Sequence, residues 1–542
     1  MLLGPAPTVV RADDLDSLVG VKSAEVSRLW SEKDYARAVT ILEEIRDLPG
    51  IEKSPWYVTN ASYNLACGYA LLGRKEDALA ALERAVSEGY SDWQHVLDDS
   101  DLSGLKDHAR FNHIVERMKS DASLWAGSLA NVPFGPNLSA EQKIGGLSKI
   151  WSEVRYNFAY FDHAPGLDWD SLYLTYIPLV RKTTNTKDYY RLLSEFCAQL
   201  RDGHTSVDVP GELFVEMFSR PPLDTRLIED RVLIVRVLND SLRVAGIQPG
   251  LEVVSVDGQP VRDYAAQHVA PYGSASTPQG KDATVFGLYL LCGSPRDSVS
   301  LELRDSEGKT YARKVARTYH RILSHEKPVE FRVLKDHVAY VALNSFGGDE
   351  VIAAFDSLFP QIASAKELIL DVRENTGGNS SVGWAILGCL TDQPFRVGLW
   401  QRRNYEPQRR AWGMNMRWIT EEGPLQPPNG AKHFKGSVAV LCGPLTASAA
   451  EDFCMAFDVM KRGTMVGERT AGSTGQPIWF GLPGGGTGRV CSARTMYPDG
   501  KEVVGRGIQP NVEVRPTVSD VRAGRDTVLD AAVKSMGSRS SQ

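Results

Sequence analysis

In this 542-residue chain, Ser448 is the residue whose position most favours a role in chemistry. It lies between two contrasting hydrophobic patterns. Residues 437–442 form a short apolar run, and such a run predicts a buried strand. Apolar residues with helical spacing follow it: Ala449, Phe453, Ala456, Phe457 and Met460. A serine at a strand-to-helix junction lies beside the free N–H groups and the positive dipole end of the helix, where a developing oxyanion is stabilised. Ser448 is therefore a candidate nucleophile.

An ordinary structural role competes with this interpretation. Serine is among the best N-cap residues, and Glu451, three positions later, would complete a capping box. Local geometry alone favours the cap. The nucleophile hypothesis needs two further groups from elsewhere in the chain, a general base and donors for the oxyanion.

Two other turns offer these groups. Residues 367–373 predict a second buried strand, and the adjacent Gly377 and Gly378 follow it. Paired glycines let a backbone approach a ligand and point N–H groups at it, although an ordinary strand-to-helix turn has the same pattern. His204 follows a helical pattern over residues 189–200 and lies in a turn of small polar residues. Because a single histidine has many structural uses, these residues are informative only as a set.

Five motifs occur in a fixed order along the chain. They are DGHT at 202–205, LDVRENTGGN at 370–379, TASAAED at 446–452, VGERTAG at 466–472 and GRGIQPNVEV at 505–514. Together they resemble the tail-specific (C-terminal processing) serine peptidase family, with similarity over about residues 147–514. The resemblance implies that Ser448 is the nucleophile. In the Ser-Lys branch of that family a lysine lies in a later turn, where this chain has Ser473. The resemblance thus rules against a Ser-Lys dyad, and we expect Ser473 to be dispensable.

What remains resembles the tricorn-like branch, which includes retinoid-binding relatives and pairs its serine with a histidine. This resemblance implies that His204 is the general base, as a weakly nucleophilic hydroxyl requires. It also implies an oxyanion hole made by the backbone N–H groups of Ala449 and of Gly377 or Gly378.

The chain departs from that branch around the histidine. The branch supports its histidine through a preceding serine and a glutamate near the last motif, and these positions hold Gly203 and Val504 here. Asp202 and Glu502 are the nearby carboxylates. We name both as candidates for the residue that orients His204.

Two accessory regions have their own resemblances. Residues 245–250 and 256–261 resemble parts of the PDZ-like domain that these peptidases carry. Residues 29–38 are similar to residues 71–80, and the pair resembles tetratricopeptide helical hairpins. The helical region is either a surface for a protein partner or a cap on the catalytic body.

Composition excludes several other classes. The chain is 42% hydrophobic and 24% charged, with a formal charge of -6 and a pI near 6.0, so it has no basic excess for binding nucleic acid. No apolar run approaches the ~18 residues of a membrane span. The seven cysteines are scattered and odd in number, which favours free thiols. We see no metal-ligand motif and expect no cofactor.

The predicted architecture is a multidomain α/β protein with a helical repeat-like region, a PDZ-like β domain and, by resemblance, a ClpP/crotonase-like catalytic core. The expected segments are a signal remnant or tail (1–12), a tetratricopeptide-like domain (13–125), a helical N-terminal part of the peptidase (138–214), a PDZ-like domain (215–325), the α/β core (326–518), and a C-terminal helix and tail (519–542).

The sequence therefore predicts a serine peptidase that cleaves extended peptide or protein chains. Its N-terminal helices offer one surface for a protein partner, with a cap on the catalytic body as the alternative. The alternative is a weakly active or inactive protein that binds a peptide or an apolar ligand on the same fold. Covalent labelling of Ser448 by a fluorophosphonate separates the two. We expect a periplasmic or secreted location, and otherwise a cytoplasmic one.

Overall fold

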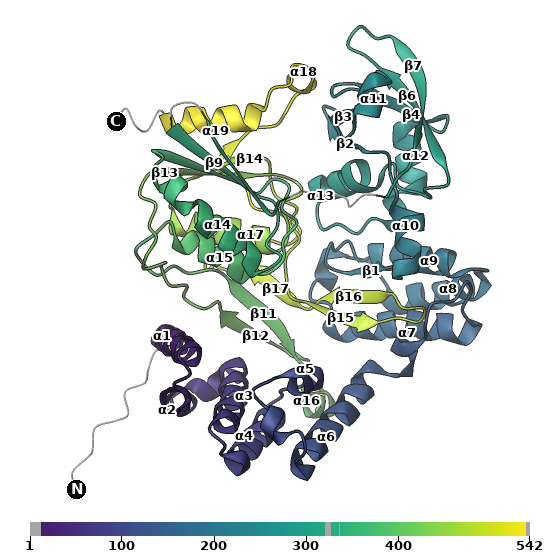
Figure 1. Ribbon diagram of the computed structural model, residues 1–542. Helices are drawn as coiled ribbons and strands as arrows, with labels where there is room; N and C mark the ends of the chain where they lie inside the picture. Colours follow the sequence, from purple (N-terminus) through teal and green to yellow (C-terminus); the bar gives the residue numbers. More distant parts are fainter. Residues whose placement is uncertain (1–11, 320–326, 335–336, 538–542) are drawn as a thin grey trace. The chain divides into compact units, whose positions relative to one another are not determined.

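The computed structural model describes residues 12–319, 327–334 and 337–537. The chain forms two compact units, residues 1–128 and residues 129–542. Helices build the first unit, and helices with sheets build the second (Figure 1). The predicted class, a mixed α/β protein with an N-terminal helical region, is confirmed. The signal remnant expected at 1–12 falls almost entirely outside the described residues.

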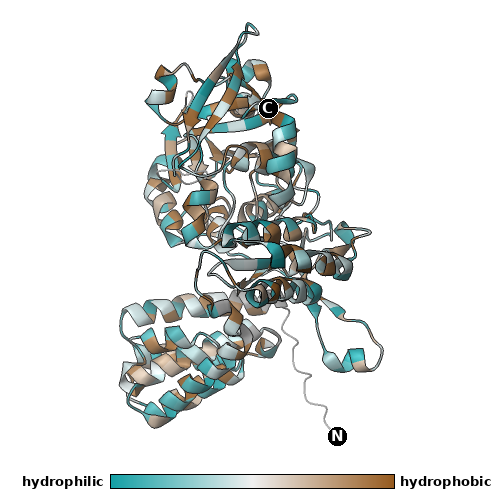
Figure 2. Ribbon diagram, turned by 90° about the vertical axis from the view of Figure 1, so that its right-hand side faces the viewer, coloured by the Kyte–Doolittle hydropathy of each residue, from teal (hydrophilic) through white to brown (hydrophobic). Residues whose placement is uncertain are grey.

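The first unit consists of helices, and the first four of them pack one against the next along the chain. Small residues allow close packing: Ala38 and Ala78 are fully buried, and a Cβ atom added at Gly68 would lie 2.5 Å from a Val39 methyl carbon. Figure 2 shows hydrophilic and hydrophobic residues mixed along these helices, as is typical of helices with one buried face. The tetratricopeptide resemblance stays a prediction. The α-helices are α1 (Ala12–Ser31), α2 (Tyr35–Arg46), α3 (Pro55–Leu71), α4 (Lys75–Ser87), α5 (Trp93–Asp98) and α6 (Ala109–Ala126).

A six-stranded sheet lies at the centre of the second unit, in the order β18-β14-β13-β10-β9-β8. All neighbouring strands are parallel except β8, which runs antiparallel to β9 at one edge. The strands are β8 (Val329–Val333), β9 (Val338–Leu343), β10 (Glu367–Asp371), β13 (Ser437–Cys442), β14 (Thr464–Gly467) and β18 (Val512–Glu513).

Helices cover both faces of this sheet. Leu368 and Leu370 of β10 join the core beneath α14, α15 and α17, whereas Ile369 packs on the other face with Val528 and Ala532 of α19. A strand covered on both sides must be apolar throughout, which explains the continuous apolar runs of the sequence. The helices are α14 (Asp349–Ala363), α15 (Ser380–Gly388), α17 (Ala449–Met460) and α19 (Thr527–Gly537).

A helical layer with a small sheet precedes this core in the second unit. Strand β1 pairs antiparallel with β16, so that Ser206 lies opposite Arg489. This pairing ties the segment after His204 to a hairpin nearly 300 residues later in the chain. The elements are α7 (Ala140–Asn157), α8 (Trp169–Lys182), α9 (Thr186–Ala198), β1 (Ser206–Asp208), β15 (Pro477–Gly481) and β16 (Thr487–Cys491).

The segment predicted to be PDZ-like contains an antiparallel sheet in the order β2-β3-β4-β6-β7. It contacts the core through Arg236, whose guanidinium lies 3.2 Å from the Glu374 carboxylate, and through Glu229, which accepts a bond from the Val518 N–H at 3.0 Å. The PDZ-like identity stays a prediction. The strands are β2 (Leu223–Ile228), β3 (Arg231–Val237), β4 (Glu252–Val256), β5 (Gln259–Pro260), β6 (Ser298–Arg304) and β7 (Thr310–Ala316); the helices are α10 (Gly211–Phe218), α11 (Asp240–Val244), α12 (Val261–His268), α13 (Pro278–Asp282) and a π-helix (Ala283–Tyr289).

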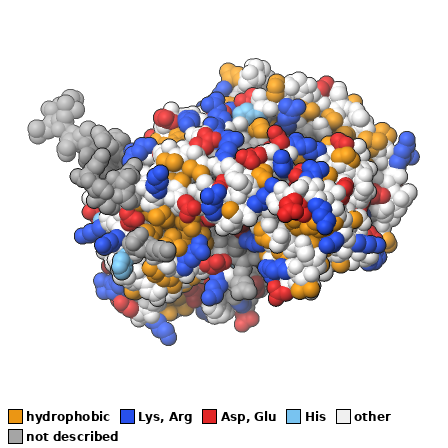
Figure 3. Space-filling model, turned by 90° about the horizontal axis from the view of Figure 1, so that it is seen from above, with side chains coloured by type: hydrophobic (Ala, Val, Ile, Leu, Met, Phe, Trp, Pro, Cys, Tyr) orange, Lys and Arg blue, Asp and Glu red, His pale blue; other side chains and the backbone are white. Residues whose placement is uncertain are grey.

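A second three-stranded sheet, β12-β11-β17, extends from the core. Its elements and the last short helix are β11 (Leu399–Asn404), α16 (Pro407–Ala411), β12 (Arg417–Glu422), β17 (Ala493–Met496) and α18 (Val518–Arg522). On the face drawn in Figure 3, basic and acidic side chains are interspersed. Within the described ranges, no helix has the length and apolarity needed to cross a bilayer.

Candidate active site

Ser448 lies at the carboxyl edge of the parallel sheet, in the turn from β13 to α17. Its backbone has φ 56° and ψ -128°, a region that a residue with a Cβ atom rarely adopts. Strained junctions of this kind hold nucleophiles in hydrolases, because they expose the hydroxyl above the sheet. The side chain is half-buried. The position agrees with the predicted strand-to-helix turn.

The capping alternative is wrong. Ser448 occupies the N-cap position of α17, yet its side chain makes no capping hydrogen bond. Glu451 does not close a capping box either, because its carboxylate accepts bonds from Thr470, Gly472 and Ser473. The Ser448 hydroxyl is thus free of the structural role that competed with the nucleophile hypothesis.

The structure brings His204 to Ser448, although 244 positions separate them in the chain. The imidazole Nε2 lies 3.0 Å from the Ser448 Oγ atom. Backbone contacts fix the histidine turn: the His204 N–H donates to Asp202 at 3.0 Å, and the Arg489 guanidinium donates to the Gly203 carbonyl at 2.8 Å. A base within hydrogen-bond reach of a hydroxyl is the geometry that nucleophile activation requires.

The other imidazole nitrogen contacts a residue that sequence reasoning set aside. His204 Nδ1 lies 2.7 Å from the Ser473 Oγ atom. This contact removes the basis for expecting Ser473 to be dispensable. A signal was available in the sequence: Ser473 follows β14, the parallel neighbour of β13, so its loop emerges at the same edge of the sheet as Ser448.

Ser473 lies in a turn that the buried Glu451 carboxylate holds in place. The N–H groups of Gly472 and Ser473 donate to this carboxylate at 2.8 and 2.7 Å, and the Thr470 hydroxyl donates as well. The side chain of Glu451 is only 1% exposed. Burial raises the pKa of Glu451 to about 7, while the three donors act in the opposite direction.

Backbone amides beside Ser448 form a candidate oxyanion hole. Among the described residues, neither the Ala449 N–H nor the Gly378 N–H has a hydrogen-bond acceptor. The Gly377 N–H, in contrast, donates to the Asn375 side chain at 2.9 Å. Of the two glycines that the sequence offered, the geometry therefore favours Gly378 as the donor.

Gly377 has a different use. Its φ is +108°, and a Cβ atom added there would lie 2.6 Å from Ser448 Cβ and 3.0 Å from the Ala449 nitrogen. Only glycine lets the loop after β10 approach the Ser448 turn this closely.

Electrostatics keep the imidazole neutral. Burial, together with the positive charge of Arg489, lowers the pKa of His204 to about 3. The ring is therefore uncharged near pH 7, with one nitrogen able to accept a proton.

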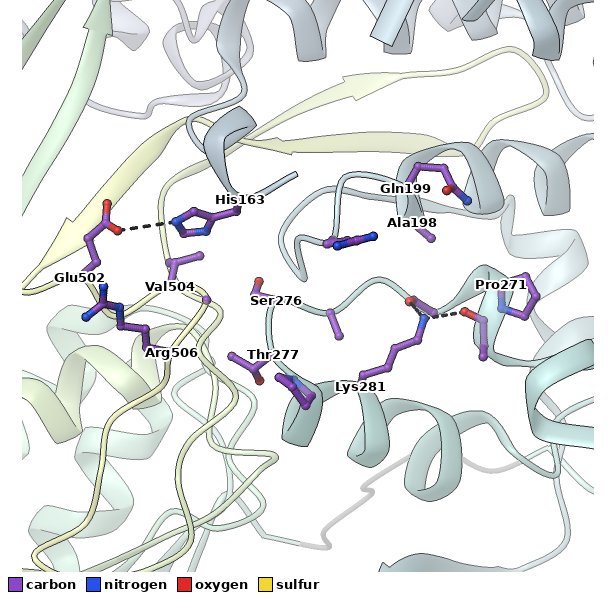
Figure 4. A pocket seen from close by; sticks show the side chains of 16 residues that line it. His163, Ala198, Gln199, Pro271, Ser276, Thr277, Lys281, Glu502, Val504 and Arg506 are labelled. Carbon is purple, nitrogen blue, oxygen red and sulfur yellow. Dashed lines mark hydrogen bonds and ion pairs between the residues drawn. The ribbon is translucent and has the colours of Figure 1, made fainter. Parts of the chain in front are cut away.

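The two carboxylates expected to orient His204 do not contact its ring in the structure. Asp202 accepts from the His204 backbone instead. Glu502 lies against Arg494 at 2.8 Å and His163 at 3.6 Å. It lines a cavity of about 620 Å³ together with Val504, and Figure 4 shows its carboxylate paired with His163. The residue beside the ring nitrogen is Ser473.

One group of potential metal ligands occurs among the described residues, in the first unit: Cys67, Asp99 and Asp101. The Tyr63 hydroxyl donates to Asp99 at 2.7 Å, and the Trp30 indole donates to Asp101 at 3.1 Å. Neutral donors thus already satisfy both carboxylates, so the group has the features of a structural hydrogen-bond network.

A serine, a neutral histidine and two unpaired amides at the carboxyl edge of a parallel sheet have the layout of a serine peptidase. Residues 337–514 match the model of Peptidase family S41, and residues 146–198 match that of the Tricorn protease C1 domain. The match to Peptidase family S41 includes both Ser448 and Ser473.

Similar proteins agree with these matches. The chain is 25% identical over 399 residues to Putative tricorn protease homolog 2 of Streptomyces coelicolor, covering 68% of this chain and 30% of that protein. It is 23% identical over 294 residues to Carboxyl-terminal-processing peptidase 1, chloroplastic, of Arabidopsis thaliana, covering 53% of this chain and 52% of that protein. The chain thus spans about half or less of the length of these relatives.

A solved structure shares the fold. Mature CPAF complexed with lactacystin has a TM-score of 0.56 to this structure, with 71% of this chain and 95% of that chain covered. The sequence identity is 16%, so the likeness concerns the fold alone.

Proposed function

We propose that this protein is a serine peptidase in which Ser448 is the nucleophile and His204 the general base. One observation carries the proposal: the Ser448 hydroxyl lies 3.0 Å from the ring nitrogen of a histidine whose lowered pKa keeps it neutral. The unpaired N–H groups of Gly378 and Ala449 beside the hydroxyl add the electrostatic component that acyl transfer needs.

The steps follow from these groups. The Ser448 Oγ atom attacks the scissile carbonyl carbon while His204 Nε2 takes the hydroxyl proton. The oxyanion forms between the Gly378 and Ala449 amides. When the intermediate collapses, the C–N bond breaks, His204 returns the proton to the leaving amine, and the acyl group stays on Ser448. Water then attacks the ester, with His204 again as base, and releases the new carboxylate.

The substrate class in this proposal is an extended peptide chain. An extended chain can pair with a strand edge, and its terminal carboxylate can be held by backbone N–H groups in a PDZ-like groove. The relative named as a carboxyl-terminal-processing peptidase supports recognition of a C-terminus. The antiparallel sheet of residues 223–316 is our candidate for that groove.

Labelling with a fluorophosphonate tests the proposal. We expect the wild type to gain one covalent adduct by intact mass, at Ser448 by peptide mapping. Ser448→Ala should gain none, and His204→Gln should react at least ~10³-fold more slowly, because members of one catalytic unit do not act additively. Labelling of Ser448→Ala at the wild-type rate contradicts the assignment. Adduct formation without hydrolysis of any peptide in a broad library favours the binding-protein alternative.

Two further expectations belong to the same proposal. The N-terminal helices, residues 13–125, would bind a protein partner, and deleting them should leave fluorophosphonate labelling intact while weakening cleavage of that partner. A periplasmic or secreted location, with the cytoplasm as the alternative, is testable by fractionating cells that express the full chain.

A further inference from the structure

His204 has two ring nitrogens, and each contacts one hydroxyl. Nε2 faces Ser448 at 3.0 Å, and Nδ1 faces Ser473 at 2.7 Å. A neutral imidazole carries its proton on one nitrogen only, so the partner of one nitrogen determines what the other can do. If Nε2 is to accept the Ser448 proton, Nδ1 must carry the hydrogen and donate it to Ser473.

We propose that Ser473 is the positioning residue of this site: its hydroxyl accepts the Nδ1–H of His204 and thereby fixes the ring orientation and the tautomer that serve Ser448. In Ser-His-Asp sites a buried aspartate has this role. The inference rests on the proposed function and adds a third residue to it.

Ser473 contacts both proposed catalytic residues, which a bystander would not. Its side chain contacts the His204 ring, and its carbonyl accepts the Ser448 N–H at 2.8 Å. One residue thus positions the base through its hydroxyl and the nucleophile through its backbone.

The position of Ser473 is itself fixed by hydrogen bonds from its turn to Glu451. Glu451 accepts the Ser473 N–H at 2.7 Å and the Gly472 N–H at 2.8 Å, and Glu451 belongs to the first turn of α17, the helix that Ser448 begins. A side chain of the nucleophile helix therefore holds the turn that orients the base.

Gly203 makes room for this arrangement. A Cβ atom added at Gly203 would lie 2.5 Å from the Ser473 Oγ atom and 3.1 Å from its Cβ atom. Any larger residue at position 203 would displace the hydroxyl from its place beside the ring. The glycine before the histidine and the serine of the distant turn are complementary in shape.

The experiment compares fluorophosphonate inactivation of the wild type with that of Ser473→Ala. We expect the second-order rate constant to fall about 10- to 100-fold, the range for a buried donor that loses its partner. Ser473→Thr, which keeps a hydroxyl, should recover part of the rate. Gly203→Ala tests the same contact from the other side and should lower the rate similarly.

The matched control is Thr474→Val. The Thr474 hydroxyl is also buried, in the same turn, but it donates to Asp452 at 2.9 Å and does not contact His204. We expect its labelling rate to stay within about two-fold of the wild type even where its melting temperature falls, because it loses the same kind of buried hydroxyl bond.

A spectroscopic measurement separates positioning from simple destabilisation. In protein with ¹⁵N-labelled histidine, the wild type should show a protected Nδ1–H proton assigned to His204 by its absence from His204→Gln. Ser473→Ala should lose this signal while remaining folded. An unchanged labelling rate in Ser473→Ala, or an Nε2–H tautomer in the wild type, overturns the role of Ser473. A wild type that is not labelled at Ser448 overturns the proposed function instead.

Discussion

The proposed nucleophile and the proposed base of this site are held in place by different kinds of structure. On the nucleophile side, Gly378 and Ser448 follow β10 and β13, parallel neighbours in which Asp371 lies opposite Leu441. Their meeting is a direct consequence of sheet register. On the base side, His204 comes from the turn between α9 and β1, and Ser473 comes from the loop after β14. Their meeting depends on how separate layers of the unit pack.

The two sides differ in how far the rules of sheet structure determine which residues meet. The loops that follow parallel strands lie at one edge of the sheet. Few other arrangements of the loops are therefore possible on the nucleophile side. On the base side, the ring contacts Ser473, Asp202 accepts the backbone N–H of His204, and Arg489 donates to the carbonyl of the preceding residue. We therefore expect substitutions on the nucleophile side to abolish activity, and substitutions around the base to reduce it by varying amounts.

The largest expected effect separates strain from chemistry at position 448. Ser448→Ala and Ser448→Gly should both lose at least ~10⁴-fold in kcat/KM, because each removes the nucleophile. Their stabilities should differ, because glycine adopts φ 56° without strain. The free energy of unfolding of Ser448→Gly should therefore be about 1 kcal/mol higher than that of Ser448→Ala. Thermal unfolding measures the difference. Equal stability of the two variants would show that the junction is not strained.

The next effect concerns the approach of the β10 loop to the nucleophile. Gly377→Ala places a Cβ atom 2.6 Å from Ser448 Cβ and should lower kcat by about 10²- to 10³-fold, the effect of a displaced oxyanion donor. Gly485→Ala is the control, since its φ of +89° carries a similar backbone cost but no atom lies within 4 Å of the added carbon. Both variants should lose about 1 kcal/mol of stability from backbone strain. Only Gly377→Ala should lose activity.

The sequence predicts the loops that meet at Ser448 but not the contact between His204 and Ser473, for physical reasons. Apolar runs before Gly377 and Ser448 show that both loops follow buried strands, and parallel neighbours bring such loops together. His204 was found through its motif. Its partner Ser473 is not predicted, because Asp202 and Glu502 are the carboxylates near Gly203 and Val504, the two positions that support the histidine in the tricorn-like branch. The ring instead faces Ser473, 269 positions away. The contacts of Glu451 are not predicted either. The local sequence is the same whether this glutamate caps its own helix or binds the N–H groups of a distant turn.

A smaller effect is expected from pH, through the Glu451 carboxylate that holds the Ser473 turn. Burial raises the pKa of Glu451 to about 7, whereas that of His204 is lowered to about 3, so Glu451 is the group that titrates near neutrality. The charge of Asp452, whose own pKa burial raises, raises the pKa of Glu451 further, and the Glu451 charge in turn raises the pKa of the Tyr497 hydroxyl. As the pH falls through 7, Glu451 gains a proton and loses an acceptor for the turn. We expect kcat/KM to fall about five-fold between pH 8 and pH 5.5.

Stability should change in the opposite direction. A carboxyl whose pKa is higher in the folded state than in the unfolded state stabilises the fold below the unfolded value of 4.5, and this contribution is lost as the pH rises through 7. Glu451→Gln should remove both trends and give a low, nearly flat pH profile. An acidic limb that persists in Glu451→Gln would assign the titration to another group.

The smallest expected effect contrasts the two carboxylates that the sequence placed near the base. Glu502 pairs with Arg494 in a partly exposed site and does not contact the imidazole, so Glu502→Gln should leave kcat/KM within about two-fold of the wild type, as for most surface pairs. Asp202 is 2% exposed and accepts the His204 N–H, so Asp202→Asn should cost about 1 kcal/mol of stability and a few-fold in kcat. Steady-state kinetics with thermal unfolding distinguishes them. A larger loss in Glu502→Gln than in Asp202→Asn would mean that the cavity beside Val504 contributes to the base side, and that Ser473 is not its only support.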